Sequence, residues 1–130
     1  MKKIKLLLIV FLMGTVLAGC STSKLSDAYD EELLKSDAKE IVNMFCNEEY
    51  DKVVDKMSDK MKGLITAQKL KEGWEPMKEK NGEFDSIAKE GVVGNDGLAT
   101  IIEVVNFKNG KTQFKITYNE DMKLEGLYLK

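Results

Sequence analysis

In the first half of the chain, apolar positions recur every three or four residues, which is the period of an amphipathic helix. This pattern predicts a helix over residues 27–47 with Ser26 as its N-cap, and a second helix over residues 48–64. A third helix is expected after Thr66, another favoured N-cap residue, and it should end or kink just before Pro76. The positions expected to face the core are Leu34, Ala38, Ile41, Val42, Phe45, Tyr50, Val53, Val54, Met57, Met61, Leu64, Ala67, Leu70, Trp74 and Met77.

After Gly82 the spacing of apolar residues falls to two, which is the period of a β-strand. Turn sequences such as Asn109-Gly110 separate the strands and favour antiparallel hairpins. Helices followed by an antiparallel sheet make an α+β domain, with three helices packed on one face of four strands. The expected strands cover residues 83–93, 98–108, 111–118 and 123–129.

The second predicted strand is apolar on both of its sides. Ile102 and Val104 point one way, and Ala99, Ile101, Val105 and Phe107 point the other. A strand of this kind is usually covered on both faces. Either the sheet curls around a pocket, or its outer face meets another subunit, for which a two-fold homodimer is the simplest assembly.

The N-terminus has the features of a secretory signal. Lys2, Lys3 and Lys5 precede an apolar run over residues 6–16, which is too short for a membrane span. The run is followed by Leu17-Ala18-Gly19-Cys20, which closely resembles the lipobox of bacterial lipoproteins.

The lipobox resemblance implies that a diacylglycerol is attached to the thiol of Cys20 and that the chain is cut before it. Residues 1–19 are then a signal peptide, residues 20–26 a lipidated tether, and residues 27–130 the α+β domain. Two acyl chains anchor a protein stably, so we expect it on the outer face of the cell membrane. An ordinary secreted protein with an incidental cysteine is the alternative.

The composition of the chain limits the classes of binding partner that are expected. The formal net charge is −2, and loss of the three leader lysines lowers it to −5. A mildly acidic chain is a poor match for nucleic acid, or for anionic lipid bound through surface lysines. There is no histidine, so the usual general base and the commonest metal ligand are missing, and no metal or cofactor is indicated. All 20 basic residues are lysine, a bias typical of low-GC, Gram-positive sources.

Once Cys20 is lipidated, Cys46 has no partner for a disulfide. It occupies an apolar position of the first predicted helix, beside Phe45. We interpret it as a small core residue rather than a reactive thiol, because no histidine or arginine is present to lower its pKa.

Over about residues 35–130 the sequence resembles the bacterial family called domain of unknown function 3887. The resemblance rests on motifs in the predicted helices and strands, namely Tyr50-Asp51-x-Val53-Val54, Met61-Lys62-x-x-Ile65-Thr66, Leu70, Trp74, Gly82-x-Phe84 and Leu124-x-Gly126-Leu127. The family is similar to the nuclear transport factor 2-like superfold, which implies a helical cone closed by a curved sheet. That superfold includes enzymes, ligand binders and dimerisation modules, so it does not assign a function.

Three functions are compatible with this sequence. The first is a non-catalytic interaction or accessory module that binds an envelope protein or a second copy of itself. The second is a domain that binds a small apolar ligand in the cone. The third is a carboxylate-based isomerase or lyase that uses Glu103, the one carboxylate in an apolar setting. The candidate pocket-lining residues are Tyr50, Trp74, Phe84, Phe107, Phe114, Tyr118 and Tyr128.

Overall fold

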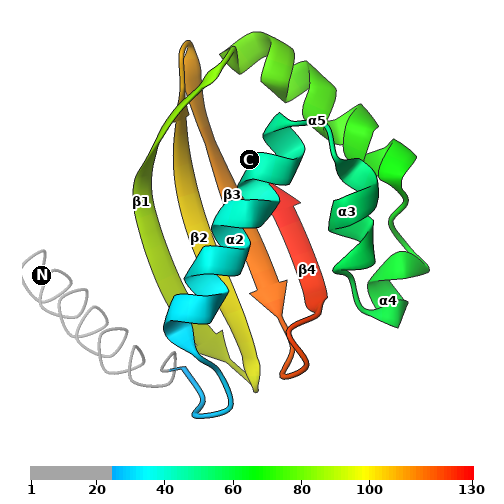
Figure 1. Ribbon diagram of the computed structural model, residues 1–130, viewed down its shortest axis with the longest axis vertical. Helices are drawn as coiled ribbons and strands as arrows, with labels where there is room; N and C mark the ends of the chain where they lie inside the picture. Colours follow the sequence, from blue (N-terminus) through cyan, green and yellow to red (C-terminus); the bar gives the residue numbers. More distant parts are fainter. Residues whose placement is uncertain (1–24) are drawn as a thin grey trace, which may run out of the picture.

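The computed structural model describes residues 25–130, in which helices precede a four-stranded antiparallel sheet (Figure 1). Cys20 lies outside the described residues. The sheet is an open meander with the strand order β1-β2-β3-β4. The predicted α+β fold is confirmed, but the expectation that the sheet curls into a cone is wrong. The elements are α2 (Glu31–Cys46), α3 (Tyr50–Asp55), α4 (Asp59–Lys62), α5 (Ala67–Asn81), β1 (Phe84–Asn95), β2 (Leu98–Phe107), β3 (Gly110–Tyr118) and β4 (Leu124–Leu129).

Helix α2 begins later than its pattern predicts. Its N-cap is Asp30, whose carboxylate accepts a hydrogen bond from the backbone N–H of Leu33 at 3.1 Å. Ser26 instead closes a turn, with its carbonyl accepting from the N–H of Tyr29. An aspartate cap also favours the helix dipole, which explains why Asp30 caps the helix. The predicted core stripe of α2, from Leu34 to Phe45, is buried as expected.

The single helix predicted over residues 48–64 is wrong, because the chain breaks into α3 and α4 at residues 56–58. There the backbone pairs with β4. The N–H of Leu124 donates to the Lys56 carbonyl at 2.8 Å, and the N–H of Ser58 donates to the Leu124 carbonyl at 2.9 Å. Ser58 then caps α4. Hydrogen bonds to a distant strand thus replace those of a continuous helix.

Helix α5 begins at its predicted cap, Thr66, and does not end near Glu75 but continues through Pro76 to Asn81. Its end is held by the β2–β3 hairpin. The side-chain amide of Asn81 donates to the Thr112 hydroxyl at 2.9 Å. A Cβ at Gly110 would collide with the Asn81 side chain, so the hairpin needs glycine at this close approach.

Helix α2 crosses one face of the sheet and α5 packs on the same side, while α3 and α4 lie beside the β4 edge (Figure 1); we call this covered face the inner face. Residues directly opposite in antiparallel strands share a face, so the strand register assigns each side chain. The inner-face residues of β2 and β3 are buried, and they are Ala99, Ile101, Glu103, Val105, Phe107, Thr112, Phe114, Ile116 and Tyr118. No helix among residues 25–130 is long and apolar enough to cross a membrane.

The opposite side of the sheet, the outer face, is not covered by any described element. Ile102 and Val104 of β2 lie on it and are half-buried between neighbouring strands. Of the two explanations that the sequence offered for this doubly apolar strand, the curled sheet is therefore wrong. An uncovered face with apolar residues is the observed arrangement.

Candidate functional site

The seven aromatic residues predicted from the sequence to line a pocket differ in their burial. Trp74, Phe114 and Tyr118 are fully buried, and Tyr50 and Phe107 nearly so. In contrast, 43% of Phe84 and 58% of Tyr128 are exposed. Tyr128 is directly opposite Lys115 in the register, so it lies on the outer face, away from the other six.

The buried aromatics form one interlocked cluster that joins α2, α5 and the inner face. The Trp74 ring lies 5.5–5.8 Å from the rings of Phe45, Phe107 and Phe114. Phe45 was recognised from the sequence only as a core position, yet it contacts three aromatic neighbours, including Tyr50. Tilted and edge-to-face packing of this kind fills space tightly. The space between helices and sheet is therefore mostly hydrophobic core.

Two surface hollows border this cluster. One, of about 430 Å³, lies where α5 meets β1 and is lined by Cys46, Asn47, Trp74, Lys78, Gly82, Glu83, Phe84 and Phe107. A smaller apolar groove of about 160 Å³ separates α5 from β4 and is lined by Phe45, Lys69, Leu70, Gly73, Trp74, Met77, Leu127 and Leu129. Trp74 borders both, and its indole N–H finds no hydrogen-bond acceptor among the described residues. Tyr50 lines a separate hollow with Glu48 and Lys71.

Cys46 is a free, half-buried thiol beside the larger hollow. Burial raises its pKa, and the nearby Lys78 ammonium only partly offsets this effect. Lys78 is itself engaged, since it donates to the Cys46 carbonyl and to the Glu48 carboxylate, both at 3.1 Å. A thiol with a raised pKa is a weak nucleophile at neutral pH, which suits the interpretation of Cys46 as a packing residue.

The unusual chemistry of the inner face is a pair of carboxyl groups. Glu103 of β2 is fully buried, and Glu90 of β1 is directly opposite it in the register. Neither oxygen of Glu103 has a hydrogen-bond partner within the described part of the chain. Lys39 of α2 lies above the pair, with its Nζ 3.6 Å from the Glu90 carboxylate. Two carboxylates so close together cannot both ionise cheaply.

Burial and the adjacent Glu90 carboxyl group raise the pKa of Glu103 to about 8, although the Lys39 and Lys35 ammonium groups lower it in part. Glu103 is therefore mostly protonated at neutral pH. A raised carboxyl pKa is the property of a general acid. However, Glu103 lines none of the hollows described above, and its buried carboxyl group lies beside Glu90 rather than in an open site.

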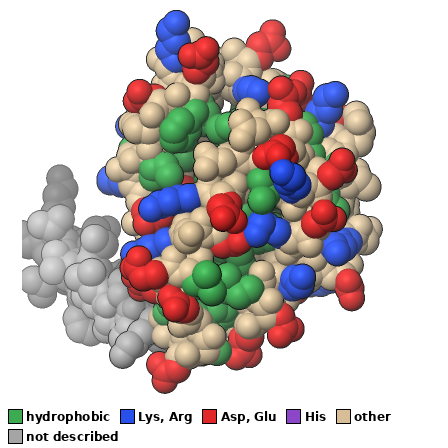
Figure 2. Space-filling view, in the orientation of Figure 1, with side chains coloured by type: hydrophobic (Ala, Val, Ile, Leu, Met, Phe, Trp, Pro, Cys, Tyr) green, Lys and Arg blue, Asp and Glu red, His purple; other side chains and the backbone are tan. Residues whose placement is uncertain are grey.

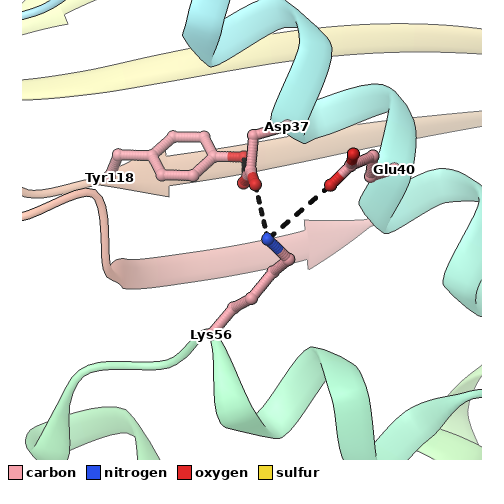
Figure 3. Close-up of polar contacts among 4 residues, drawn as sticks. All are labelled: Asp37, Glu40, Lys56 and Tyr118. Carbon is pink, nitrogen blue, oxygen red and sulfur yellow. Dashed lines mark hydrogen bonds and ion pairs between the residues drawn. The ribbon is translucent and has the colours of Figure 1, made fainter.

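A second polar cluster ties α2 to the far end of the inner face (Figure 3). The hydroxyl of Tyr118 donates to one oxygen of Asp37 at 2.6 Å, and the ammonium of Lys56 donates to the other. Lys56 also lies 3.9 Å from the Glu40 carboxylate. Burial and the Asp37 carboxylate raise the pKa of Tyr118 well above its usual range. Every member of this cluster is paired, so it stabilises the fold rather than offering a reactive group.

No group of three or more Cys, Asp or Glu side chains within residues 25–130 is arranged to hold a metal ion. The Glu90–Glu103 pair provides only two carboxyl groups, and Lys39 already neutralises one of them.

Comparison with known families decides the assignment. Residues 38–127 match the model of the family described as "Protein of unknown function (DUF3887)". The chain belongs to the DUF3887 family. The resemblance seen in the sequence motifs is thereby confirmed over most of the α+β domain. Among curated proteins there is no match.

One solved structure has the same fold as this DUF3887 protein. It is titled "NMR structure of protein from Ruminococcus gnavus ATCC 29149", with a TM-score of 0.72 and 22% sequence identity. The match covers 82% of this chain and 96% of the Ruminococcus chain. At this identity the similarity shows the fold alone.

Proposed function

We propose that this protein is a lipid-anchored module on the outer face of a Gram-positive cell membrane, with a non-catalytic role in protein interaction. Leu17-Ala18-Gly19-Cys20, after a basic and apolar leader, supports the anchor. The proposal includes a structural relationship to the nuclear transport factor 2-like superfold. The order of helices followed by antiparallel strands supports this relationship.

One observation favours an interaction module over an enzyme. The aromatic side chains that would line a catalytic pocket instead pack against each other, with Trp74, Phe114 and Tyr118 fully buried. The carboxyl group with the most perturbed pKa, Glu103, is sealed beneath α2. A substrate therefore has no path to the most acid–base-competent group of the domain, whereas the domain surface is available for binding.

A small apolar ligand in the groove between α5 and β4 is the second candidate. The buried, unpartnered indole N–H of Trp74 supports it, because a ligand with one hydrogen-bond acceptor would satisfy that donor. The groove's volume of about 160 Å³ restricts such a ligand to a few heavy atoms. Native mass spectrometry of the purified domain would show a co-purified mass in that case.

The proposed function is tested by expressing the full chain and a Cys20→Ser variant in a Gram-positive host. We expect the wild type in the membrane fraction, with mass spectrometry showing a diacylglycerol on an N-terminal Cys20. The variant should remain uncleaved or be released into the medium. Cross-linking of the anchored protein should then capture an envelope protein. A wild-type chain in the medium without lipid would contradict the anchor.

A further inference from the structure

Three lysines lie on the central part of the outer face of the sheet. Lys89 is opposite Val104, Lys111 is opposite Asn106, and Lys115 is opposite Ile102 in the register. Of the acidic strand residues, Glu90 and Glu103 point to the inner face, and Glu125 lies at an irregularity near the start of β4. Asp85 lies in the bulge at the start of β1, at the rim of the outer face, where its carboxylate accepts a hydrogen bond from Ser86. The three lysines Lys89, Lys111 and Lys115, with Ile102, Val104 and Tyr128, are called the lysine face below.

The three lysines of this face form no ion pair with the described residues. Within the described residues, every ion pair uses a lysine from α2, α3, α5 or the α3–α4 connection, namely Lys35, Lys39, Lys52, Lys56 or Lys78. Lys89, Lys111 and Lys115 are all exposed, and none of them is within ion-pair distance of a described carboxylate. Three unneutralised positive charges therefore share one flat surface.

Apolar groups fill the space between these charges. Ile102 and Val104 are half-buried in the centre of the face, and Tyr128 stands beside Lys115 with 58% of its surface exposed. Lysine around aliphatic residues and an exposed tyrosine is the composition of surfaces that rest at a membrane interface, where the stems lie along apolar groups and the charges meet the headgroups.

The net charge of the chain conceals this face, because it averages over both sides of the sheet. Figure 2 looks at the helix-bearing side and shows acidic and basic side chains interspersed there. The lysine face is also a poor surface for a two-fold homodimer. Such a dimer would bring the same three lysines of two copies together without carboxylates between them. Its charge fits an anionic occupant instead.

The length of the chain before the domain indicates which anionic surface is within reach. The described domain begins at Leu25, five residues after Cys20. Five extended residues span at most about 17 Å, so a lipidated Cys20 holds the domain against the headgroups of its own membrane. Each lysine near an anionic bilayer contributes about a fivefold increase in binding, and the tether adds a high effective concentration.

We propose that the lysine face docks on the anionic surface of the membrane that anchors Cys20, leaving the helices directed away from it. The inference rests on the proposed lipid anchor and adds the orientation of the domain. In this arrangement, the hollows along α5 are presented to partners in the cell envelope. The acidic first turns of α2 remain exposed at the side of the domain rather than beneath it.

The test uses the lipidated protein, residues 20–130, in vesicles of phosphatidylcholine alone or mixed equally with phosphatidylglycerol. An amine-reactive reagent labels the lysines, and mass spectrometry reads each site. We expect labelling of Lys89, Lys111 and Lys115 to slow at least fivefold on the anionic vesicles only, and 0.5 M salt to reverse this protection. Exposed lysines on the helices serve as internal controls with unchanged rates, namely Lys60, Lys62 and Lys80.

Equal labelling of both lysine groups on anionic vesicles would overturn the proposal. The proposal would also be overturned if the lysine face were protected from labelling only in native membranes, because a protein partner would then cover it. Loss of the protein from phosphatidylcholine vesicles would contradict the anchor instead. In that event, the Cys20→Ser chain is titrated with anionic vesicles, and labelling of the same three lysines still decides whether the face binds them.

A matched pair of variants tests the charges directly. Tyr128→Trp places an indole on the lysine face, and brominated lipids quench it if the face docks. Combining it with Lys89→Gln, Lys111→Gln and Lys115→Gln should abolish this quenching. The same indole with Lys60→Gln, Lys62→Gln and Lys80→Gln, an equal change in net charge, should keep it. Equal quenching in the two triple variants would reject a charge-driven docking.

Discussion

The two faces of the sheet are built from the same strands but differ in how their ionisable side chains are accommodated. On the inner face, Glu103 is buried beside Glu90 and, with a pKa of about 8, is mostly protonated at neutral pH. On the outer face, three lysines are exposed and need no partner. A buried charge is costly to ionise, whereas an exposed one remains solvated. The inner face therefore determines stability, and the outer face is available for binding.

The largest expected difference between the faces comes from removing one aromatic ring from each. Trp74→Ala should lower the free energy of unfolding by about 4 kcal/mol, because the fully buried ring supports Phe45, Phe107 and Phe114. Tyr128→Ala, on the outer face, should change it by about 0.5 kcal/mol or less. Urea denaturation measures both. Similar losses of unfolding free energy in the two variants would contradict the proposed difference between the two faces.

The carboxyl pair predicts an unusual pH dependence. The pKa of Glu103 is about 8 in the folded chain against 4.5 ordinarily, so the folded state binds more protons across this interval. Stability should fall as the pH rises from 4.5 to 8 and then level off. Glu103→Gln should flatten this slope and stabilise the protein at pH 8, by on the order of 3 kcal/mol.

Thermal unfolding at several pH values checks this prediction. Glu83→Gln is the matched control, since Glu83 is exposed and its replacement should leave the wild-type slope intact. A Glu103→Gln curve parallel to that of the wild type would mean that Glu103 does not titrate in this interval.

The polar cluster of α2 should contribute less. Asp37→Ala leaves the buried hydroxyl of Tyr118 without its acceptor and Lys56 without its closest partner, at a cost of about 2 kcal/mol. Glu40→Ala is the control, because its carboxylate is exposed and lies 3.9 Å from Lys56, and its loss should cost about 0.5 kcal/mol or less. Chemical denaturation in which both variants lose equal stability would contradict a special role for the Tyr118–Asp37 hydrogen bond.

The smallest effect on folding is expected on the lysine face. Replacing Lys89, Lys111 and Lys115 with Gln should change the free energy of unfolding by about 0.5 kcal/mol or less, because none of them forms an ion pair in the described structure. Urea denaturation of this triple variant, compared with the Lys60, Lys62 and Lys80 triple, provides the measurement. A loss above 2 kcal/mol would show that these lysines stabilise the fold.

Local patterns in the sequence were enough to predict much of the fold. The stripe from Leu34 to Phe45 and the alternation along residues 111–118 each specify one buried face, and both are observed. The break at Lys56 was not predictable, because it depends on hydrogen bonds to Leu124, which is far away in the chain.

The candidate sites depend on strand register, which the sequence did not reveal. The isolated position of Glu103 was visible, but its pairing with Glu90 depends on the register of the β1–β2 hairpin, in which Asn95 is opposite Leu98. The same register gathers Lys89 with Lys111 and Lys115 on one face. Net charge alone pointed away from an anionic surface, since it averages over two faces of different composition.

The most direct test of the contrast between the faces is amine labelling of the anchored protein in its own membranes, before and after detergent solubilisation. We predict that Lys89, Lys111 and Lys115 react more slowly than Lys60, Lys62 and Lys80 in intact membranes, and that detergent removes the difference. Equal rates in intact membranes would show that the outer face is uncovered in the cell and would contradict its role as the binding face.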